Sequence, residues 1–182
     1  MKKAFAQKGA VLIVSMIILL VLSLISVSAA RTILLQEKMT FASRDAKVAL
    51  EVAEALVRQG ESEIEKMETT GNFSPEANVS WLHEEGAGLD NLADAAGWSD
   101  TNSKLIKVEM GSGDKKQSMY GRVFIEMAGT AEQVDPSGNI TIEGYGQTTG
   151  GGEVQVFRVV ALGYGISGST TRMVISHYGK RF

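Results

Sequence analysis

The sequence predicts an α+β protein, in which one long N-terminal helix packs on a C-terminal antiparallel β-sheet of about four strands. Two observations predict this fold class. Residues 10–67 change from an unbroken apolar run to an apolar face that recurs every three or four positions, which is the helical period. Residues 118–182 hold short alternating segments separated by glycine-rich turns, which is the pattern of strands. Residues 68–117 lie between them and are expected to form a variable connecting region.

The helix is expected to begin in a membrane. From Ala10 to Ala30 the chain has no charged residue, and serines are the only polar residues in the run. At about 1.5 Å per residue, such a run crosses the roughly 30 Å hydrocarbon core of a bilayer as one helix. Lysines precede the run and Arg31 follows it, so residues 10–31 are expected to form a transmembrane helix with a cytoplasmic N-terminus. The long C-terminal part then lies on the far side of the membrane.

The first residues allow three interpretations. A secretory signal peptide could be cut at Ser28-Ala29-Ala30, but the apolar run is too long for one. A plain membrane anchor fits the run but leaves the Lys8-Gly9 junction unexplained. The favoured interpretation is a short basic leader, residues 1–9, which resembles a prepilin leader in its length, its charge and its last residue. Cleavage after Gly9 would then start the mature chain at Ala10.

Beyond Arg31 the helix is expected to continue as an amphipathic segment over residues 32–67. One side carries charged residues and reads as a solvated face, with pairs such as Glu54 and Arg58 at a favourable spacing. Small and apolar residues recur on the other side, so this side can approach a sheet closely. The helix is expected to end near Thr69-Thr70-Gly71. The residues on the small and apolar side are Ala42, Ala46, Ala49, Ala53, Leu56, Gly60 and Ile64, and the first five of them are expected to face the sheet.

The connection over residues 68–117 is rich in Gly, Asn, Asp and Ser and is expected to be irregular. Leu89, Leu92 and Ala96 suggest one short helix inside it, closed by Gly97-Trp98. Trp81 and Trp98 are expected to fix this connection onto the domain, although one of them could instead be exposed for a partner.

Four segments of residues 118–182 alternate between apolar and polar positions and are expected to form a meander of strands. The segments are 120–126, 140–143, 154–159 and 173–178. The turn at residues 135–139 combines proline and glycine, which suit its corners. Gly144-Tyr145-Gly146 and Gly163-Tyr164-Gly165 repeat one pattern, which is interpreted as two similar hairpin edges.

Composition excludes several function classes. The chain has 21 Asp and Glu against 18 Lys and Arg in 182 residues, so no basic footprint for nucleic acid is expected. It has no cysteine, so no disulfide can form and stability must come from packing and strand pairing. His83 and His177 are the only histidines, and neither belongs to a recognisable catalytic or metal-binding motif. No enzyme activity, no cofactor and no metal are therefore expected.

A basic leader, one long half-buried helix, a variable connection and a C-terminal sheet resemble the type IV pilin architecture. The residues after the run resemble the N-terminal signature of PilX-type minor pilins, and residues 120–126 and 174–182 resemble that family's first strand and C-terminal ending. Cysteines often found in pilin C-terminal regions are missing, so no disulfide can be carried over. The resemblance covers residues 8–61 well and 118–182 moderately. The matching N-terminal residues are Arg31, Glu37-Lys38-Met39, Arg44-Asp45, Ala49, Ala53-Glu54-Ala55, Arg58 and Gly60-Glu61.

One departure from major pilins carries mechanistic meaning. Major pilins have a glutamate at the fifth mature position, which in the family pairs with the N-terminal amine of a neighbouring subunit. Counted from Ala10, this chain has Val14 there. A subunit without that carboxylate can sit where no neighbour's amine needs neutralising, as at a pilus tip or in an initiating complex. Glu37 lies too far along the helix to replace it and is assigned to a solvated or interfacial face.

The resemblance implies a minor pilin that primes type IV pilus assembly and is incorporated at or near the pilus tip, supporting adhesion and twitching motility. It implies processing by a prepilin peptidase and N-methylation of Ala10, and a location first in the inner membrane and then in the extracellular pilus (fimbrium). The implied partners are the peptidase, other minor pilins, the major pilin, the inner-membrane assembly machinery, the membrane and a surface or host ligand.

Two alternatives to this function stay open. A minor pseudopilin of a type II secretion system shares the leader and can also lack the acidic fifth residue, but it usually bears a large helical insertion. A membrane-anchored periplasmic domain is the other alternative. A pocket with converging polar groups in residues 68–117 would favour it.

Overall fold

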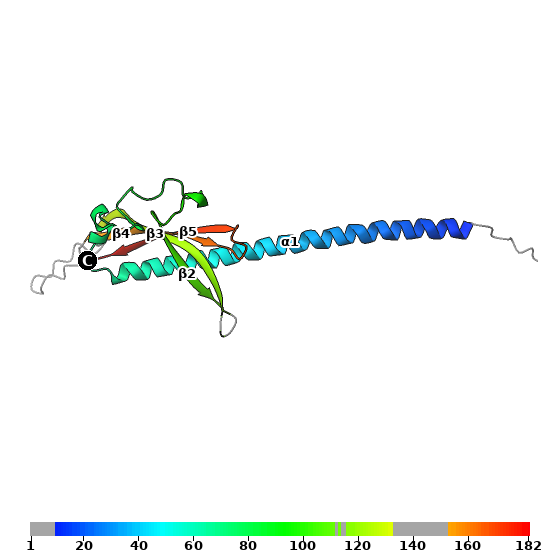
Figure 1. The fold of residues 1–182 in the computed structure, drawn as a ribbon, viewed down its shortest axis with the longest axis horizontal. Helices are drawn as coiled ribbons and strands as arrows, with labels where there is room; N and C mark the ends of the chain where they lie inside the picture. The colour runs from blue at the N-terminus through cyan, green and yellow to red at the C-terminus, as the bar shows by residue number, and fades with distance from the viewer. Residues whose placement is uncertain (1–9, 112, 114–115, 133–152) are drawn as a thin grey trace, which may run out of the picture. The chain divides into compact units, whose positions relative to one another are not determined.

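The computed structural model describes residues 10–111, 113, 116–132 and 153–182, and it divides into two compact units, residues 1–44 and 45–182 (Figure 1). Each unit is described by itself. The expected leader, the expected strand at residues 140–143, the turn at 135–139 and the repeat Gly144-Tyr145-Gly146 lie outside the described residues.

Helix α1 runs from Ala10 to Lys66 and contributes to both units. In the first unit three serine hydroxyls bond back to carbonyls one turn earlier, Ser15 to Leu12 at 2.8 Å, Ser23 to Leu20 at 2.7 Å and Ser26 to Leu22 at 2.8 Å. These bonds satisfy the hydroxyls without water, so the serines are compatible with an apolar surrounding. Among the described residues, α1 is the one helix long and apolar enough to cross a membrane.

The second unit holds the end of α1 and a five-stranded sheet. The sheet order is β1-β3-β4-β5, and β2 also pairs with β3. The β2–β3, β3–β4 and β4–β5 pairs are antiparallel, and β1–β3 is parallel. The strands are β1 (Leu82–His83), β2 (Lys104–Met110), β3 (Gln117–Glu132), β4 (Glu153–Tyr164) and β5 (Thr171–Lys180).

The α+β fold class is confirmed, and the sheet differs from the expected one in two respects. The sheet is mixed, because the two-residue β1 runs parallel to β3 through Leu82↔Ile125. β2 also forms inside the segment that was expected to be irregular. The reason is visible in its side chains, since Ile106 and Val108 turn toward the core while Lys107 and Glu109 are exposed. Its alternation is short, covering residues 106–110, and lies in a segment rich in polar residues and glycine, which concealed it.

The short helix expected near residues 89–96 is only a 3-10 turn, η3 (Ala95–Gly97). Asp94 precedes it and accepts a hydrogen bond from the Ala96 amide at 3.0 Å. Leu89 and Leu92 do not continue it as a helix; they pack individually against Trp98 and its neighbours. Two further 3-10 turns, η1 (Gly71–Phe73) and η2 (Pro75–Ala77), follow α1.

The core has two parts, one on each face of the sheet. Between α1 and the sheet, buried residues such as Leu56, Val123 and Val159 form the larger cluster. On the opposite face, Trp98 packs on Phe124 with ring centroids 5.3 Å apart. The unit therefore has three layers, α1, the sheet and the connection, and they follow one another in Figure 1. Trp98, at 5% exposed, fixes the connection as expected, whereas Trp81 is only half-buried.

Glycines let α1 lie directly on the strands. A Cβ atom on Gly163 would lie 2.1 Å from the Ala49 carbonyl oxygen, so a backbone-to-backbone contact occupies that space. A Cβ atom on Gly121 would lie 2.4 Å from Leu56, and one on Gly60 would lie 2.7 Å from Val159. Gly163 was interpreted as part of a hairpin edge. It does lie beside the β4–β5 hairpin, and its lack of a side chain also admits the helix.

We expect Gly163→Ala to lower the free energy of unfolding by about 3 kcal/mol or more, because the Ala49 and Ala53 backbone atoms cannot move aside as a side chain would. Urea unfolding of the full chain in detergent micelles measures this. Tryptophan fluorescence reports on residues 45–182, which contain both tryptophans. Gly97→Ala is the control and should change stability by less than about 0.5 kcal/mol, since nothing lies within 4 Å of its added Cβ. Equal effects of the two substitutions would contradict the close-packing account.

Candidate assembly site

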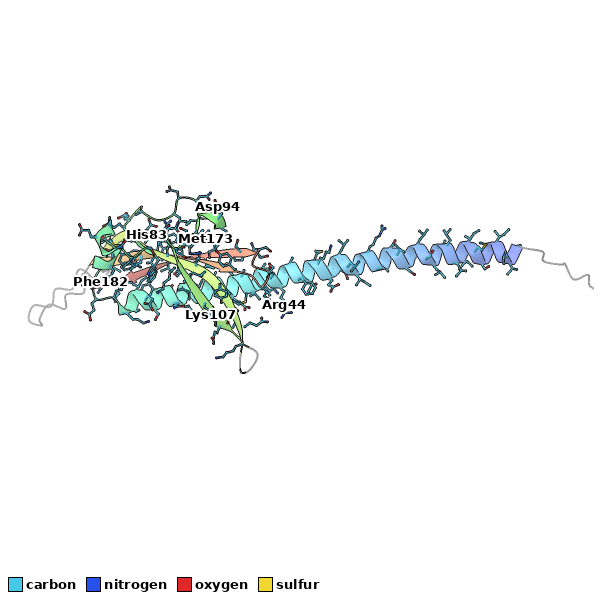
Figure 2. All side chains as sticks on the ribbon, in the orientation of Figure 1. Arg44, His83, Asp94, Lys107, Met173 and Phe182 are labelled. Carbon is cyan, nitrogen blue, oxygen red and sulfur yellow. The ribbon has the colours of Figure 1, made fainter. Side chains whose placement is uncertain are left out.

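The residues expected to act in processing and assembly lie at the start of α1. Gly9 is outside the described residues, and Ala10 is the first residue of the helix. Val14 is 55% exposed and Glu37 is exposed. Figure 2 shows side chains projecting on all sides of this part of the helix. Among the described residues of the first unit, every side chain from residue 10 to 44 is exposed, so a long apolar surface is available to lipid or to other helices.

The face expected to meet the sheet divides into two parts in the structure. Ala49, Ala53 and Leu56 are fully buried. Ala46 is half-buried and Ala42 is exposed, so the covered part of α1 begins after Ala42. The helical period therefore placed these residues on one side of α1. It could not indicate how far along α1 the sheet covers that side. Gly60 and Ile64, which the period placed on the same face, are also buried, and the buried α1 residues outside that face are Val52 and Val57.

Asp45 anchors the loop between β4 and β5 to α1. Its carboxylate accepts hydrogen bonds from the Ser167 amide at 3.1 Å and from the Ser167 hydroxyl at 2.5 Å. Gly165 lies so close that an added Cβ would be 2.5 Å from Asp45 Oδ1. The Ser167 hydroxyl, followed by the Thr170 hydroxyl and the Ser167 amide, lowers the pKa of Asp45 to about 2. The carboxylate thus fixes the loop in its charged form.

The C-terminal strand fastens the other end of the covered segment of α1. Ser176 donates a hydrogen bond to Glu61 at 2.7 Å, and Tyr178 donates one to Glu65. The Lys180 ammonium donates to the carbonyls of Ile64 at 2.9 Å and Glu65 at 2.7 Å, and also to that of Met67. The last carbonyls of a helix lack partners within the helix and carry partial negative charge. Lys180 therefore caps α1 from a distant part of the sequence.

A buried ion pair holds the connection on the far face of the sheet. Glu126, at 4% exposed, pairs with Arg158 on the neighbouring strand. Its other carboxylate oxygen accepts a hydrogen bond from the Gly86 amide at 2.8 Å. An added Cβ at Gly88 would lie 2.8 Å from Glu126, so only glycine fits beside this carboxylate. The buried Glu126 carboxylate is thus satisfied by Arg158 on one oxygen and by the backbone amides of Gly86 and Gly88 on the other.

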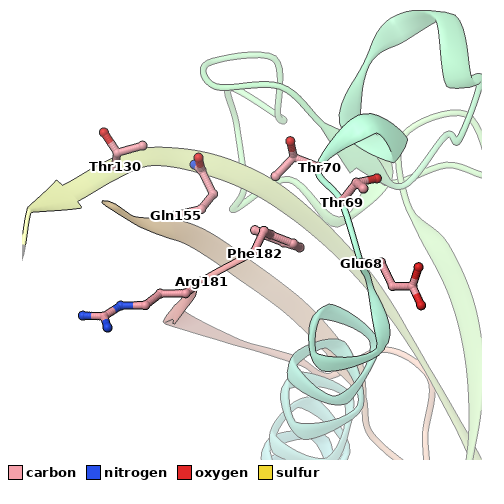
Figure 3. Close-up of a pocket in the computed structure, with 7 residues that line it drawn as sticks. All are labelled: Glu68, Thr69, Thr70, Thr130, Gln155, Arg181 and Phe182. Atoms are coloured by element: carbon pink, nitrogen blue, oxygen red, sulfur yellow. The ribbon is translucent and has the colours of Figure 1, made fainter. Parts of the chain in front are cut away.

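A hollow of about 520 Å³ lies near the C-terminus, between the end of α1 and strands β3 and β4 (Figure 3). Figure 3 shows Phe182 near its centre, with the charged ends of Glu68 and Arg181 pointing away from each other. Threonine and glutamine side chains complete the lining, and within the described residues no group of three or more His, Cys, Asp or Glu could hold a metal ion. The lining therefore supplies hydrogen-bonding groups around an aromatic ring.

Sequence reasoning missed the Asp45 anchor, the Lys180 cap and the Glu126–Arg158 pair. Each joins residues more than thirty positions apart, so no local spacing signals it. The one usable signal was a set of short polar residues, Ser167-Gly168-Ser169, in the turn before the last strand. Such residues donate readily to a carboxylate, but the sequence does not say which carboxylate.

We expect Asp45→Asn to reduce the dependence of stability on pH. Because the folded-state pKa is lowered from 3.8 to about 2, the charged carboxylate stabilises the folded chain above about pH 4. This contribution is lost as the pH falls toward 2. The urea midpoint, followed by tryptophan fluorescence from about pH 5 to about pH 2, should therefore fall further for the natural chain than for Asp45→Asn. Asp45 lies well beyond the apolar run that ends at Ala30.

The matched control for this measurement is Asp90→Asn, which removes an exposed carboxylate of the connection. Its midpoint should follow the natural chain through the whole pH range. Parallel curves for the natural chain and Asp45→Asn would show that the loop is not held through this carboxylate.

Comparison with known proteins finds a similarity over the residues at which α1 begins. Residues 8–58 match the family model PilX N-terminal. No curated protein and no solved structure matches the chain. The matched residues include the start of the exposed apolar surface, Asp45 and the buried Ala49, Ala53 and Leu56. Together with the fold, one long apolar helix packed on a mixed sheet, this match over residues 8–58 is consistent with a type IV pilus-related pilin of the PilX type.

Proposed function

We propose that this chain is a minor pilin that primes assembly of a type IV pilus and is incorporated at or near the pilus tip, supporting adhesion and twitching motility. The observation that carries the proposal is the match of residues 8–58 to the PilX N-terminal family. The exposed apolar surface of α1 supports it, because a helix that is apolar on all sides needs lipid or other helices around it.

Val14 supports a place at the tip or in the initiating complex. In the interior of a filament, helices pack in a medium of low dielectric constant, where an unpaired amine or carboxylate is costly. Val14 brings no carboxylate to such a place, so this subunit cannot neutralise the N-terminal amine of a neighbour at that position. A priming subunit that starts the array has no such neighbour to serve. The proposal therefore assigns this chain to the first subunits assembled.

In this role the chain is first inserted into the membrane, then processed, and then assembled. The lysine-rich residues before the run stay in the cytoplasm, the apolar part of α1 crosses the inner membrane, and residues 45–182 lie outside. A prepilin peptidase cuts after Gly9 and Ala10 becomes the methylated N-terminus. Assembly then moves α1 from lipid into contact with the helices of other pilins, which exchanges one apolar surrounding for another.

The connection favours a pilus over a secretion system. Minor pseudopilins at a tip usually bear a large helical insertion, whereas the helical elements in the described part of this connection are only the three-residue turns η1, η2 and η3. Deleting the gene in the source cell tests this choice. We expect surface pili and twitching to be lost while release of secreted proteins is unchanged. Loss of protein secretion with normal pili would assign the chain to a type II secretion system.

Processing at Gly9 gives a second prediction. Mass spectrometry of sheared pili should find a mature chain that begins at methylated Ala10. Gly9→Val should keep the leader and be absent from pili while it still accumulates in the membrane, because the branched side chain obstructs cleavage at the junction. Ala6→Val makes a similar change inside the leader and should be processed normally. A mature chain beginning after Ala30 would contradict the pilin route and indicate a secretory signal peptide.

A further inference from the structure

Strand β5 forms one side of the sheet, and among the described residues no strand pairs with its outer edge. Its ten residues pair with β4 in unbroken register from Thr171↔Tyr164 to Lys180↔Gln155. The β3–β4 pair, in contrast, contains an irregularity between Met127 and Thr130. A regular free edge of this length is a template on which another strand can pair.

The backbone groups on this edge can be assigned from the hairpin. Gly165 N–H donates to the Thr170 carbonyl at 2.8 Å, so these two residues form a hydrogen-bonded pair just before the ladder begins. Antiparallel pairs alternate between hydrogen-bonded and non-hydrogen-bonded, so every second residue of β5 turns its amide and carbonyl away from β4. The residues with outward backbone groups are Thr171, Met173, Ile175, His177 and Gly179.

Near the middle of β5, two of the exposed side chains are apolar. Met173, which is labelled in Figure 2, is 37% exposed, and Ile175 is 42% exposed. On the other face of the strand, Ser176 and Tyr178 bind Glu61 and Glu65 of α1. The helix therefore holds β5 in its extended form. A second strand could bind there at a low entropic cost, because the edge is already ordered.

The opposite edge of the sheet is protected. It is divided between the short strands β1 and β2, and lysines line β2. Lys107 and Lys116 lie 4.0 and 3.5 Å from the Glu109 carboxylate, and Lys104 lies 4.7 Å from the centre of the Trp81 ring. Short strands and charged side chains are the usual protection of sheet edges. β5 has neither proline nor bulge, and its centre presents Met173 and Ile175 to solvent.

The charged residues near β5 indicate which charge a partner would carry at this edge. From residue 154 to the end, the chain has no Asp or Glu. Arg172 is exposed, and no carboxylate in the described ranges lies within ion-pair distance of it. Glu61 and Glu65 also lie beside the strand, but each already accepts a hydrogen bond from it. An acidic side chain of a partner would therefore find its counterpart at Arg172.

We propose that the outer edge of β5 binds an edge strand of a neighbouring pilin subunit, which places apolar side chains on Met173 and Ile175 and an acidic side chain near Arg172. The inference rests on the proposed function, since association of a pilin with other pilins supplies the class of partner. The backbone ladder supplies affinity, and the apolar centre with its basic end selects the partner.

Photocrosslinking in the source cell tests the contact on the full chain. Met173 is replaced by photoreactive benzoylphenylalanine, and the adduct is identified by mass spectrometry. We expect crosslinks to an edge strand of another pilin. In this background, Ile175→Pro removes an outward amide without removing a hydrogen bond to β4 and should lower the crosslink yield about tenfold. Ile175→Val keeps the amide and is the matched control, with an unchanged yield.

Charge gives an independent readout. Arg172→Glu should lower the yield several-fold, and exchanging the facing acidic residue of the identified partner for arginine should restore it. If Ile175→Pro reduces the amount of chain in the membrane, Ile175→Lys takes its place, because lysine blocks an edge without changing the backbone. It should lower the yield in the same way.

The results that would contradict the β5 contact differ from those that would contradict the proposed function. Yields that stay unchanged in Ile175→Pro, Ile175→Lys and Arg172→Glu would overturn the edge contact. Crosslinks to a second copy of this chain, or only to the helix of another pilin, would also overturn it. Normal piliation after deletion of the gene would instead overturn the proposed function, and the partner assignment with it.

Discussion

The structure of residues 45–182 depends on how closely α1 approaches the sheet. The chain has no cysteine, so no covalent link can hold the helix against the strands. Gly163 admits the backbone of Ala49, and Gly60 admits the side chain of Val159. This contact buries the larger core cluster, and dispersion and hydrophobic contributions grow with the closeness of packing. Asp45 and Lys180 then fasten the two ends of the covered segment, where the apolar contact stops.

The elements with long and regular patterns were predictable from the sequence. The apolar run and the small residues of α1 indicated the helix, and the alternation in residues 120–126, 154–159 and 173–178 indicated strands that the structure contains. β2 was missed because its alternation is short and lies in a segment rich in polar residues and glycine. The parallel β1 was missed because two residues carry no periodic signal. The anchors of α1 could not be predicted at all, since they join residues that only the folded chain brings together.

Each of the two units presents its own kind of exposed surface. Residues 10–44 offer an exposed apolar helix, whose contacts in lipid or in a filament are unspecific in direction. Residues 171–180 offer a strand edge, whose backbone groups demand a partner in register. In the proposed priming role both surfaces would be used, because the helix permits insertion among other helices while an edge contact would define which subunit is the neighbour. Under the same proposal, Val14 would require a neighbour that needs no carboxylate at that position.

The position of the chain in the assembled pilus is the most direct measurement of the central claim. Gold-labelled antibodies against the exposed connection can be applied to intact pili and viewed by electron microscopy, with pili from a deletion strain as the control for labelling. The account predicts label at one end of each labelled pilus and none along the shaft. Label distributed along the whole length, or pili without any label beside membranes that carry the chain, would contradict a priming subunit retained at the tip.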